Sequence, residues 1–132
     1  MRRTVATWTL MLALVLPGAG WSSRADAASA GCPSVQKGVI QTCNTALVRP
    51  DRYWDWELFL VSDEDTLRRI KCVEYTLHPT FPNPVRKNCQ KGTVPERGFA
   101  LKTSGWGTFR VNIKVTFADG NEEYYSHQLI FQ

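Results

Sequence analysis

Two short segments carry the aromatic side chains best placed to bind a ligand. Residues 77–82 contain two prolines, which fix φ and keep the residue before each of them out of the α region, so His78 is predicted to lie in a turn or an extended segment. Residues 104–107 place Trp106 between two glycines, which allow another chain to approach the backbone closely. Phe81 and Trp106, on the turns of a small domain, suggest a binding slot.

Catalysis and metal binding find little support in the same chain. The sequence has two histidines, no G-x-S-x-G motif and no glycine-rich phosphate loop. Ser104 has no base beside it in sequence and is predicted to cap a turn through its hydroxyl. The acidic run 63–65 is predicted to be a solvated turn, because no spaced set of oxygen ligands accompanies it. We therefore expect no enzyme activity, no cofactor and no metal.

The first thirty residues have the features of a secretory leader. Arg2 and Arg3 precede an apolar run over residues 5–17, and small residues offer cleavage near Ala27 or Ala30. The run is too short to span a bilayer, which argues against stable membrane insertion after cleavage. An uncleaved anchor and a lipoprotein leader ending at Cys32 are the alternatives. The sequence thus predicts a leader at 1–30, an N-terminal arm at 31–50, a domain at 51–132, and a secreted or periplasmic protein.

The charge balance excludes one large class of partner. The chain has 16 Lys and Arg and 12 Asp and Glu, and removing the leader takes away three basic residues and one acidic residue. The net charge of the mature part is therefore only +2, and no stripe of Lys and Arg follows one face. We expect no nucleic-acid partner.

All four cysteines lie in the mature part, which indicates two disulfides in an exported chain. Three pairings are possible. We favour Cys32 with Cys43, which would tie down the N-terminal arm, and Cys72 with Cys89, which would brace a proline-rich loop. No two cysteines have the C-x-x-C spacing of a zinc site.

Alternation of apolar and polar residues predicts strands through most of the domain. The clearest run is 108–117, where every second residue is apolar, and residues 53–61 alternate in the same way around Trp56. In residues 67–77, Ile70 has the opposite parity to Val73 and Tyr75, which predicts a bulge or a change in which face is buried. A helix over 68–72 is the alternative there.

Shorter elements complete the predicted fold. A strand is expected at 98–103, and an Asp-Gly turn at 119–120 leads into a last strand over 122–131, where His127 is expected to be partly buried. Residues 81–97 are predicted to be a loop, the arm at 31–50 contains at most a short edge strand, and no amphipathic helix is apparent. Short strands separated by turns predict an all-β, immunoglobulin-like antiparallel β sandwich.

Residues 53–131 resemble the YEATS domain family, in particular its prokaryotic branch. The resemblance rests on the aromatic-rich segment 53–56, on the L-H-P-T-F motif within 73–84, and on the G-W-G-x-F motif within 104–109, in this order. Either motif alone would be weak, but their combination is specific.

This resemblance implies an immunoglobulin-like sandwich whose loops bind a modified lysine. Phe81 and Trp106 match the two aromatics that hold the acyl chain, and the amide would be held by the Thr80 hydroxyl and the Trp106 backbone N–H. His78 and Gly105 match flanking positions. Aromatic faces offer contact area to a flat amide, and the two polar groups fix its orientation.

Three departures from the family pattern bear on this interpretation. The expected export would separate the protein from histones, the acidic contact of some relatives has no match near Ser126, and Cys89 lies in an irregular segment that could remodel the slot. Our hypothesis is an exported, non-catalytic module that binds a protein or peptide, with an acyl-lysine-like group as the ligand. The alternatives are that Phe81 and Trp106 only cap the core, or that the domain is a structural protein that offers a sheet edge for strand pairing.

Overall fold

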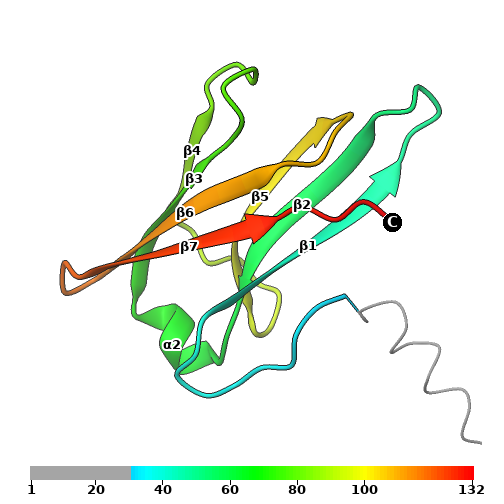
Figure 1. Cartoon of the computed structure of the whole chain (residues 1–132). Coiled ribbons are helices and arrows are strands. Elements are labelled where there is room, and N and C mark those ends of the chain that lie inside the picture. Colours follow the sequence, from blue (N-terminus) through cyan, green and yellow to red (C-terminus); the bar gives the residue numbers. More distant parts are fainter. Residues whose placement is uncertain (1–30) are drawn as a thin grey trace, which may run out of the picture. The chain divides into compact units, whose positions relative to one another are not determined.

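The computed structural model describes residues 31–132, so the expected leader and its cleavage sites lie outside the described residues. Within residues 31–132, seven strands form two antiparallel sheets packed face to face, and one short helix, α2, connects them at one end (Figure 1). The predicted all-β, immunoglobulin-like sandwich is confirmed. The first sheet has the order β1 (Gln41–Val48), β2 (Trp54–Val61), β5 (Arg97–Gly105), and the second has the order β4 (Val85–Asn88), β3 (Ile70–Thr76), β6 (Arg110–Phe117), β7 (Glu122–Gln128).

The core lies between the two sheets and follows the alternation in the sequence. On β6, Val111, Ile113 and Val115 are buried while Arg110 and Asn112 face solvent. Each such aliphatic side chain contributes about 1.5–3 kcal/mol when it leaves water. On β2 the opposite face is buried too, because Phe59 and Val61 lie beneath Cys43, Cys32 and Val35 of the N-terminal segment.

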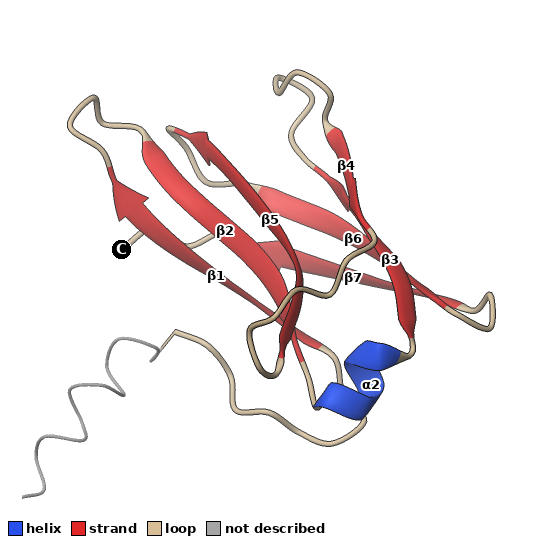
Figure 2. Ribbon diagram, turned by 180° about the vertical axis from the view of Figure 1, so that it is seen from behind, coloured by secondary structure: helices blue, strands red, loops and turns tan. Residues whose placement is uncertain are grey.

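The predicted arm at 31–50 is wrong over its second half. Residues Gln41–Val48 form a full strand that pairs along its whole length with β2, from Gln41 opposite Val61 to Val48 opposite Trp54. The polar composition of this segment is typical of a loop. An edge strand, however, can form with such a composition when it is hydrogen-bonded to one neighbouring strand and covered on one face. Figure 2 shows β1 at the edge of its sheet.

The predicted loop at 81–97 also contains a strand. Residues Val85–Asn88 pair with β3, Val73 lying opposite Asn88 and Thr76 opposite Val85. The side-chain amide of Asn88 donates to the Ala100 carbonyl at 2.8 Å, which links β4 to β5. The strand has only four residues, which is too short for the alternation to stand out.

One helical turn, α2 (Glu64–Arg68), replaces the turn and the first strand residues predicted at 62–69. Asp63 caps this helix by accepting the Thr66 N–H at 3.1 Å. It also accepts the Gly38 N–H at 2.7 Å, and these bonds hold the pKa of Asp63 well below its usual range. Strand β3 therefore begins only at Ile70, and the bulge predicted there is confirmed by the register shift between Ile70 and Cys72.

The two disulfides have the favoured pairings. Cys32 bonds to Cys43, which fastens the N-terminal segment over β2, and Cys72 bonds to Cys89, which joins β3 to the end of β4. No helix in residues 31–132 is long and apolar enough to cross a membrane.

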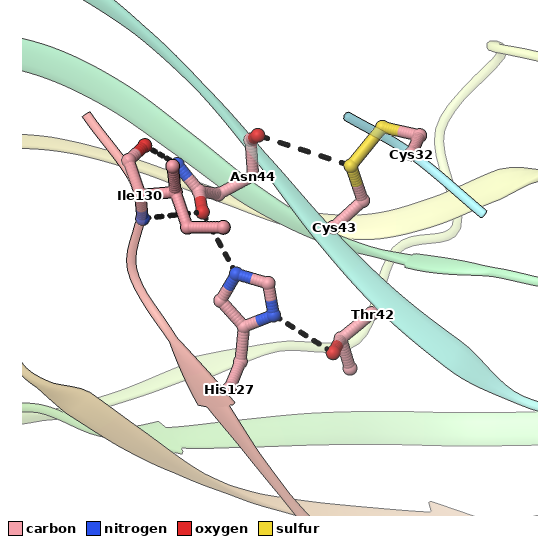
Figure 3. The surroundings of a disulfide bond; sticks show 6 residues. All are labelled: Cys32, Thr42, Cys43, Asn44, His127 and Ile130. Carbon is pink, nitrogen blue, oxygen red and sulfur yellow. Dashed lines mark hydrogen bonds between the residues drawn. A yellow bond between two sulfur atoms is a disulfide. The ribbon is translucent and has the colours of Figure 1, made fainter. Parts of the chain in front are cut away.

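His127 links the two sheets where their edge strands β7 and β1 face each other (Figure 3). Its Nδ1 lies 2.9 Å from the Thr42 hydroxyl and its Nε2 lies 2.8 Å from Oδ1 of Asn44, so it joins β7 to β1. The same Asn44 oxygen accepts the Ile130 N–H, and the Asn44 amide donates to the Ile130 carbonyl. His127 is partly buried, as predicted, and burial lowers its pKa, with the Arg110 charge adding to the effect.

Removing the second disulfide should destabilise the domain. We expect the double variant Cys72→Ala, Cys89→Ala to lose about 2–4 kcal/mol of unfolding free energy. The reason is that the disulfide restricts the loop between Cys72 and Cys89 in the unfolded chain. Urea unfolding followed by tryptophan fluorescence measures this loss. The double variant Cys32→Ala, Cys43→Ala is the matched comparison, and an unchanged midpoint for the Cys72 and Cys89 variant would show that strand pairing alone holds β4.

The stability of the domain should fall as the pH drops below about 6.5, the ordinary pKa of histidine. The pKa of His127 is lowered in the folded state, so the unfolded chain takes up the proton at a higher pH than the folded chain does. Chemical unfolding between pH 7.5 and 5.5 measures the slope. The His127→Gln variant should lose much of this pH dependence of stability, whereas His78→Gln, a change in an exposed turn, should keep it. Equal slopes in the unchanged protein and both variants would contradict the assignment of the pH dependence to His127.

Candidate functional site

An open pocket of about 400 Å³ is lined by residues of the turn after β3 and of the turn after β5. Both turns lie at the end of the sandwich opposite α2 (Figure 1). We call this pocket the slot. All five residues singled out in the sequence line it, and the structure adds Gly107, Thr108 and Phe109. The complete lining is His78, Thr80, Phe81, Gly105, Trp106, Gly107, Thr108 and Phe109.

Two backbone hydrogen bonds hold the first turn. The Leu77 N–H donates to the Pro84 carbonyl at 2.8 Å, and the Phe81 N–H donates to the His78 carbonyl at 3.0 Å. Arg86 adds side-chain bonds to the Pro82 and Asn83 carbonyls at 3.0 and 2.6 Å. The turn is therefore closed on itself, and its residues 78–80 are exposed at the rim of the slot.

His78 sets the direction of the Thr80 hydroxyl. Nδ1 of His78 lies 3.2 Å from the Thr80 backbone nitrogen and 2.8 Å from the Thr80 hydroxyl oxygen. A backbone N–H can only donate, so Nδ1 is an acceptor and the hydroxyl also donates to it. The lone pairs of the Thr80 oxygen are thereby left available to accept a hydrogen bond from a bound group.

The second turn brings a buried glycine against the first. Gly105 ends β5 and is buried, and a Cβ built on it would lie 3.3 Å from Cζ of Phe81. The absence of a side chain at this position is what lets the Phe81 ring settle between the turns. Trp106, the next residue, is 76 % exposed, so its indole stands free as one wall of the slot.

Of the three lining residues that the sequence did not identify, Phe109 is the aromatic one. The ring centroid of Phe109 lies 5.3 Å from that of Phe81 and 6.0 Å from that of His78. Its carbonyl accepts the Leu129 N–H, which ties it to the end of β7. The sequence placed Phe109 on the apolar face of a strand; it does pack against the core, but it precedes β6 and also lines the slot. The G-W-G-x-F motif was the signal that could have revealed it.

The slot is apolar and nearly uncharged. Its eight lining residues include no Asp, Glu, Lys or Arg, and His78 is the sole ionisable side chain among them. Within residues 31–132 no three His, Cys, Asp or Glu side chains gather in a way that could hold a metal ion. Such a surface suits an uncharged, partly apolar group with a few hydrogen-bonding atoms.

A larger hollow, of about 610 Å³, lies over the outer face of β1, β2 and β5. Its lining mixes charged and small polar side chains, among them Asp55, Glu57 and Lys102, with the apolar side chains of Ala46, Leu47 and Trp56. We place the candidate site at the slot because aromatic rings and an oriented hydroxyl converge there and nothing comparable converges on the sheet face.

Comparison with known proteins places most of the domain in one family. The family model of the prokaryotic YEATS domain matches residues 54–129. The chain is 38% identical over 78 residues to the protein AF-9 homolog of Kluyveromyces lactis and 36% identical over 87 residues to subunit 14 of the transcription initiation factor TFIID of Schizosaccharomyces pombe. These matches cover 54% and 63% of this chain but only 33% and 34% of the relatives, so the chain spans about a third of their length.

Two solved structures of the Yaf9 YEATS domain resemble this one. The first, described as recognising an H3K122suc peptide, has a TM-score of 0.55 and 28% identity, over 75% of this chain and 80% of the other. The second, bound to H3K27ac, has a TM-score of 0.53 and 29% identity, over 76% and 79%. Since the family model covers more than half of the sequence, the chain belongs to the prokaryotic YEATS domain family.

Proposed function

We propose that this domain is a non-catalytic module that binds an acylated lysine side chain of a protein or peptide in the slot. The observation that carries the proposal is the arrangement of aromatic rings around one oriented hydroxyl: Phe81, Phe109 and Trp106 supply the apolar walls, and Thr80 presents an oxygen that can accept.

Each part of an acylated lysine has a partner in this arrangement. The amide N–H would donate to the Thr80 hydroxyl oxygen, and the amide carbonyl would accept the Trp106 backbone N–H. The acyl chain would lie against the rings of Phe81 and Trp106, where stacking of a flat amide on aromatic faces is favourable. His78 and Gly105 act through their neighbours, His78 by turning the hydroxyl and Gly105 by making room for the Phe81 ring.

The slot should reject lysine without an acyl group. An ammonium group would leave water for a pocket whose lining offers no carboxylate, and burying an unpaired charge is costly. Acylation removes the charge and adds the amide that the polar atoms fit. The two structures of the Yaf9 domain, with H3K122suc and H3K27ac, have modified histone H3 as the ligand of that domain, which supports a modified lysine as the ligand class here.

Export from the cytoplasm is part of the proposal. Two disulfides in about a hundred residues are typical of an oxidising compartment, and the sequence of residues 1–30 has the pattern of a secretory leader. The partner would then be a secreted or periplasmic protein or peptide with an acylated lysine, in place of a histone.

The exposed tryptophan gives a direct test of the slot. We expect Trp106→Ala to weaken binding of an acetyl-lysine or crotonyl-lysine peptide by about fivefold or more, because an aromatic wall at a binding site contributes at least about 1 kcal/mol. Titration calorimetry with acylated and unmodified peptides measures this, and the unmodified peptide should not bind.

Tyr124→Ala is the matched control for this test. Tyr124 is 70 % exposed on β7, so its removal also takes away a surface aromatic, and binding should stay unchanged. Equal affinity of the Trp106→Ala variant and the unchanged protein would exclude the slot. Equal binding of any extended peptide, acylated or not, would instead favour strand pairing at a sheet edge.

The proposed export predicts a defined mature N-terminus. Expression of the full chain in a bacterium with a periplasm should yield a protein that begins after Ala27 or Ala30, as measured by intact mass. A protein of full length retained in the cytoplasm, with its cysteines reduced, would contradict the proposed export. The Ala28→Leu, Ala30→Leu variant, which removes the small residues of the second site, should shift cleavage to Ala27 or reduce it.

A further inference from the structure

Trp56 has an indole N–H that no group of residues 31–132 accepts. Its side chain is only 3 % exposed. Among the buried side-chain nitrogen and oxygen atoms of residues 31–132, Nε1 of Trp56 is the one without a hydrogen-bond partner. Buried donors are nearly always paired in folded proteins, because water is lost and must be replaced by another acceptor. A donor left in this state on the central strand of a sheet calls for an explanation.

The neighbours of this nitrogen place it directly beneath the slot. Nε1 lies 3.8 Å from the position that a Cβ of Gly105 would occupy, and the same position lies 3.3 Å from Cζ of Phe81. The indole also meets Phe109 edge to face, with ring centroids 6.0 Å apart. Gly105, Phe81 and Phe109 all line the slot, so the donor lies under its floor and not within the centre of the core.

Phe81 is the part of this floor that can move. Gly105 belongs to β5 and Trp56 to β2, and both are fixed by strand pairing. Phe81 follows β3 in a turn outside any strand and is only partly buried. Its ring can change rotamer without breaking a strand pairing, and access from the slot to the indole N–H would require such a rotation.

We infer that Trp56 is a specificity-determining residue of the slot, which donates its indole N–H to a neutral oxygen at the far end of the acyl chain. This inference rests on the proposed function. The oxygen must be neutral, a hydroxyl or a ketone, because one N–H among aromatic rings cannot replace the hydration of a carboxylate and no Lys or Arg lines the slot. A succinyl group should therefore be a poor ligand, unlike the H3K122suc peptide of the Yaf9 domain.

Two acyl groups of nearly the same shape separate this effect from simple packing. Lysine peptides carrying 3-hydroxybutyryl or 3-methylbutyryl groups differ in one hydroxyl in place of one methyl. The unchanged protein should bind the hydroxylated peptide about threefold to tenfold more tightly, the gain expected from one additional hydrogen bond. Trp56→Phe keeps an aromatic ring but lacks the N–H, so its preference should reverse toward the methyl group.

Trp54→Phe is the matched control. Trp54 lies two residues away on β2 and stacks on Phe131 at 5.3 Å, so this variant also loses an indole N–H but should keep the preference for the hydroxylated peptide. Titration calorimetry measures all three proteins with both peptides. A preference for the hydroxyl that survives in Trp56→Phe, or its absence in the unchanged protein, would overturn the inference while leaving the slot itself in place.

A measurement on the unchanged protein guards against misfolding of the Trp56 variant. In ¹H–¹⁵N spectra the indole resonance of Trp56 should shift downfield with the 3-hydroxybutyryl peptide and should not do so with the 3-methylbutyryl peptide. The same small shift with both peptides would overturn the inference. Failure of every acylated peptide to bind would overturn the proposed function, and with it the inference.

Discussion

The two sheets are held together because each presents a continuous apolar face to the other, and the slot exists where that packing ends. On β2 and β6 every second side chain points inward, so the core runs along the length of both strands. At the end of this core the last apolar groups are the rings of Phe109 and Phe81, which are only partly covered. The slot is thus continuous with the core, but no further side chains cover the rings of Phe81 and Phe109 completely.

Covalent and polar links secure the parts that the core holds weakly. β4 is a four-residue edge strand, and the bond between Cys72 and Cys89 joins its end to β3, from which the first turn of the slot departs. On the other side His127 joins β7 to β1 through Thr42 and Asn44. The disulfide fixes β4 to β3 within one sheet, and the His127 hydrogen bonds fix the edge of that sheet to the other sheet. The slot depends on both because it lies between the turn after β3 and the turn after β5, which belong to different sheets.

The chemistry of the slot depends on backbone features of a few residues. The turn at 77–84 is closed by its own hydrogen bonds, and it sets His78 so that the Thr80 oxygen faces outward as an acceptor. Gly105 allows the Phe81 ring to fill the space that a side chain would occupy. The Trp56 nitrogen also lies close to Gly105, beneath the residues that line the slot. Gly105 therefore contacts both the Phe81 ring and the buried indole N–H.

The amino-acid sequence by itself determined the features that depend on local chemistry. Alternation identified β2 and β6, opposite parity located the bulge after Ile70, the cysteine spacing favoured the two observed disulfides, and turn residues with the family motifs picked out His78, Thr80, Phe81, Gly105 and Trp106. Only the tertiary structure decided the features that depend on distant partners. β1 and β4 are strands because β2 and β3 lie beside them, and α2 forms where Asp63 can cap it and Leu67 can be buried. The packing of the two sheets also brings Phe109 into the lining of the slot and Trp56 against Phe109.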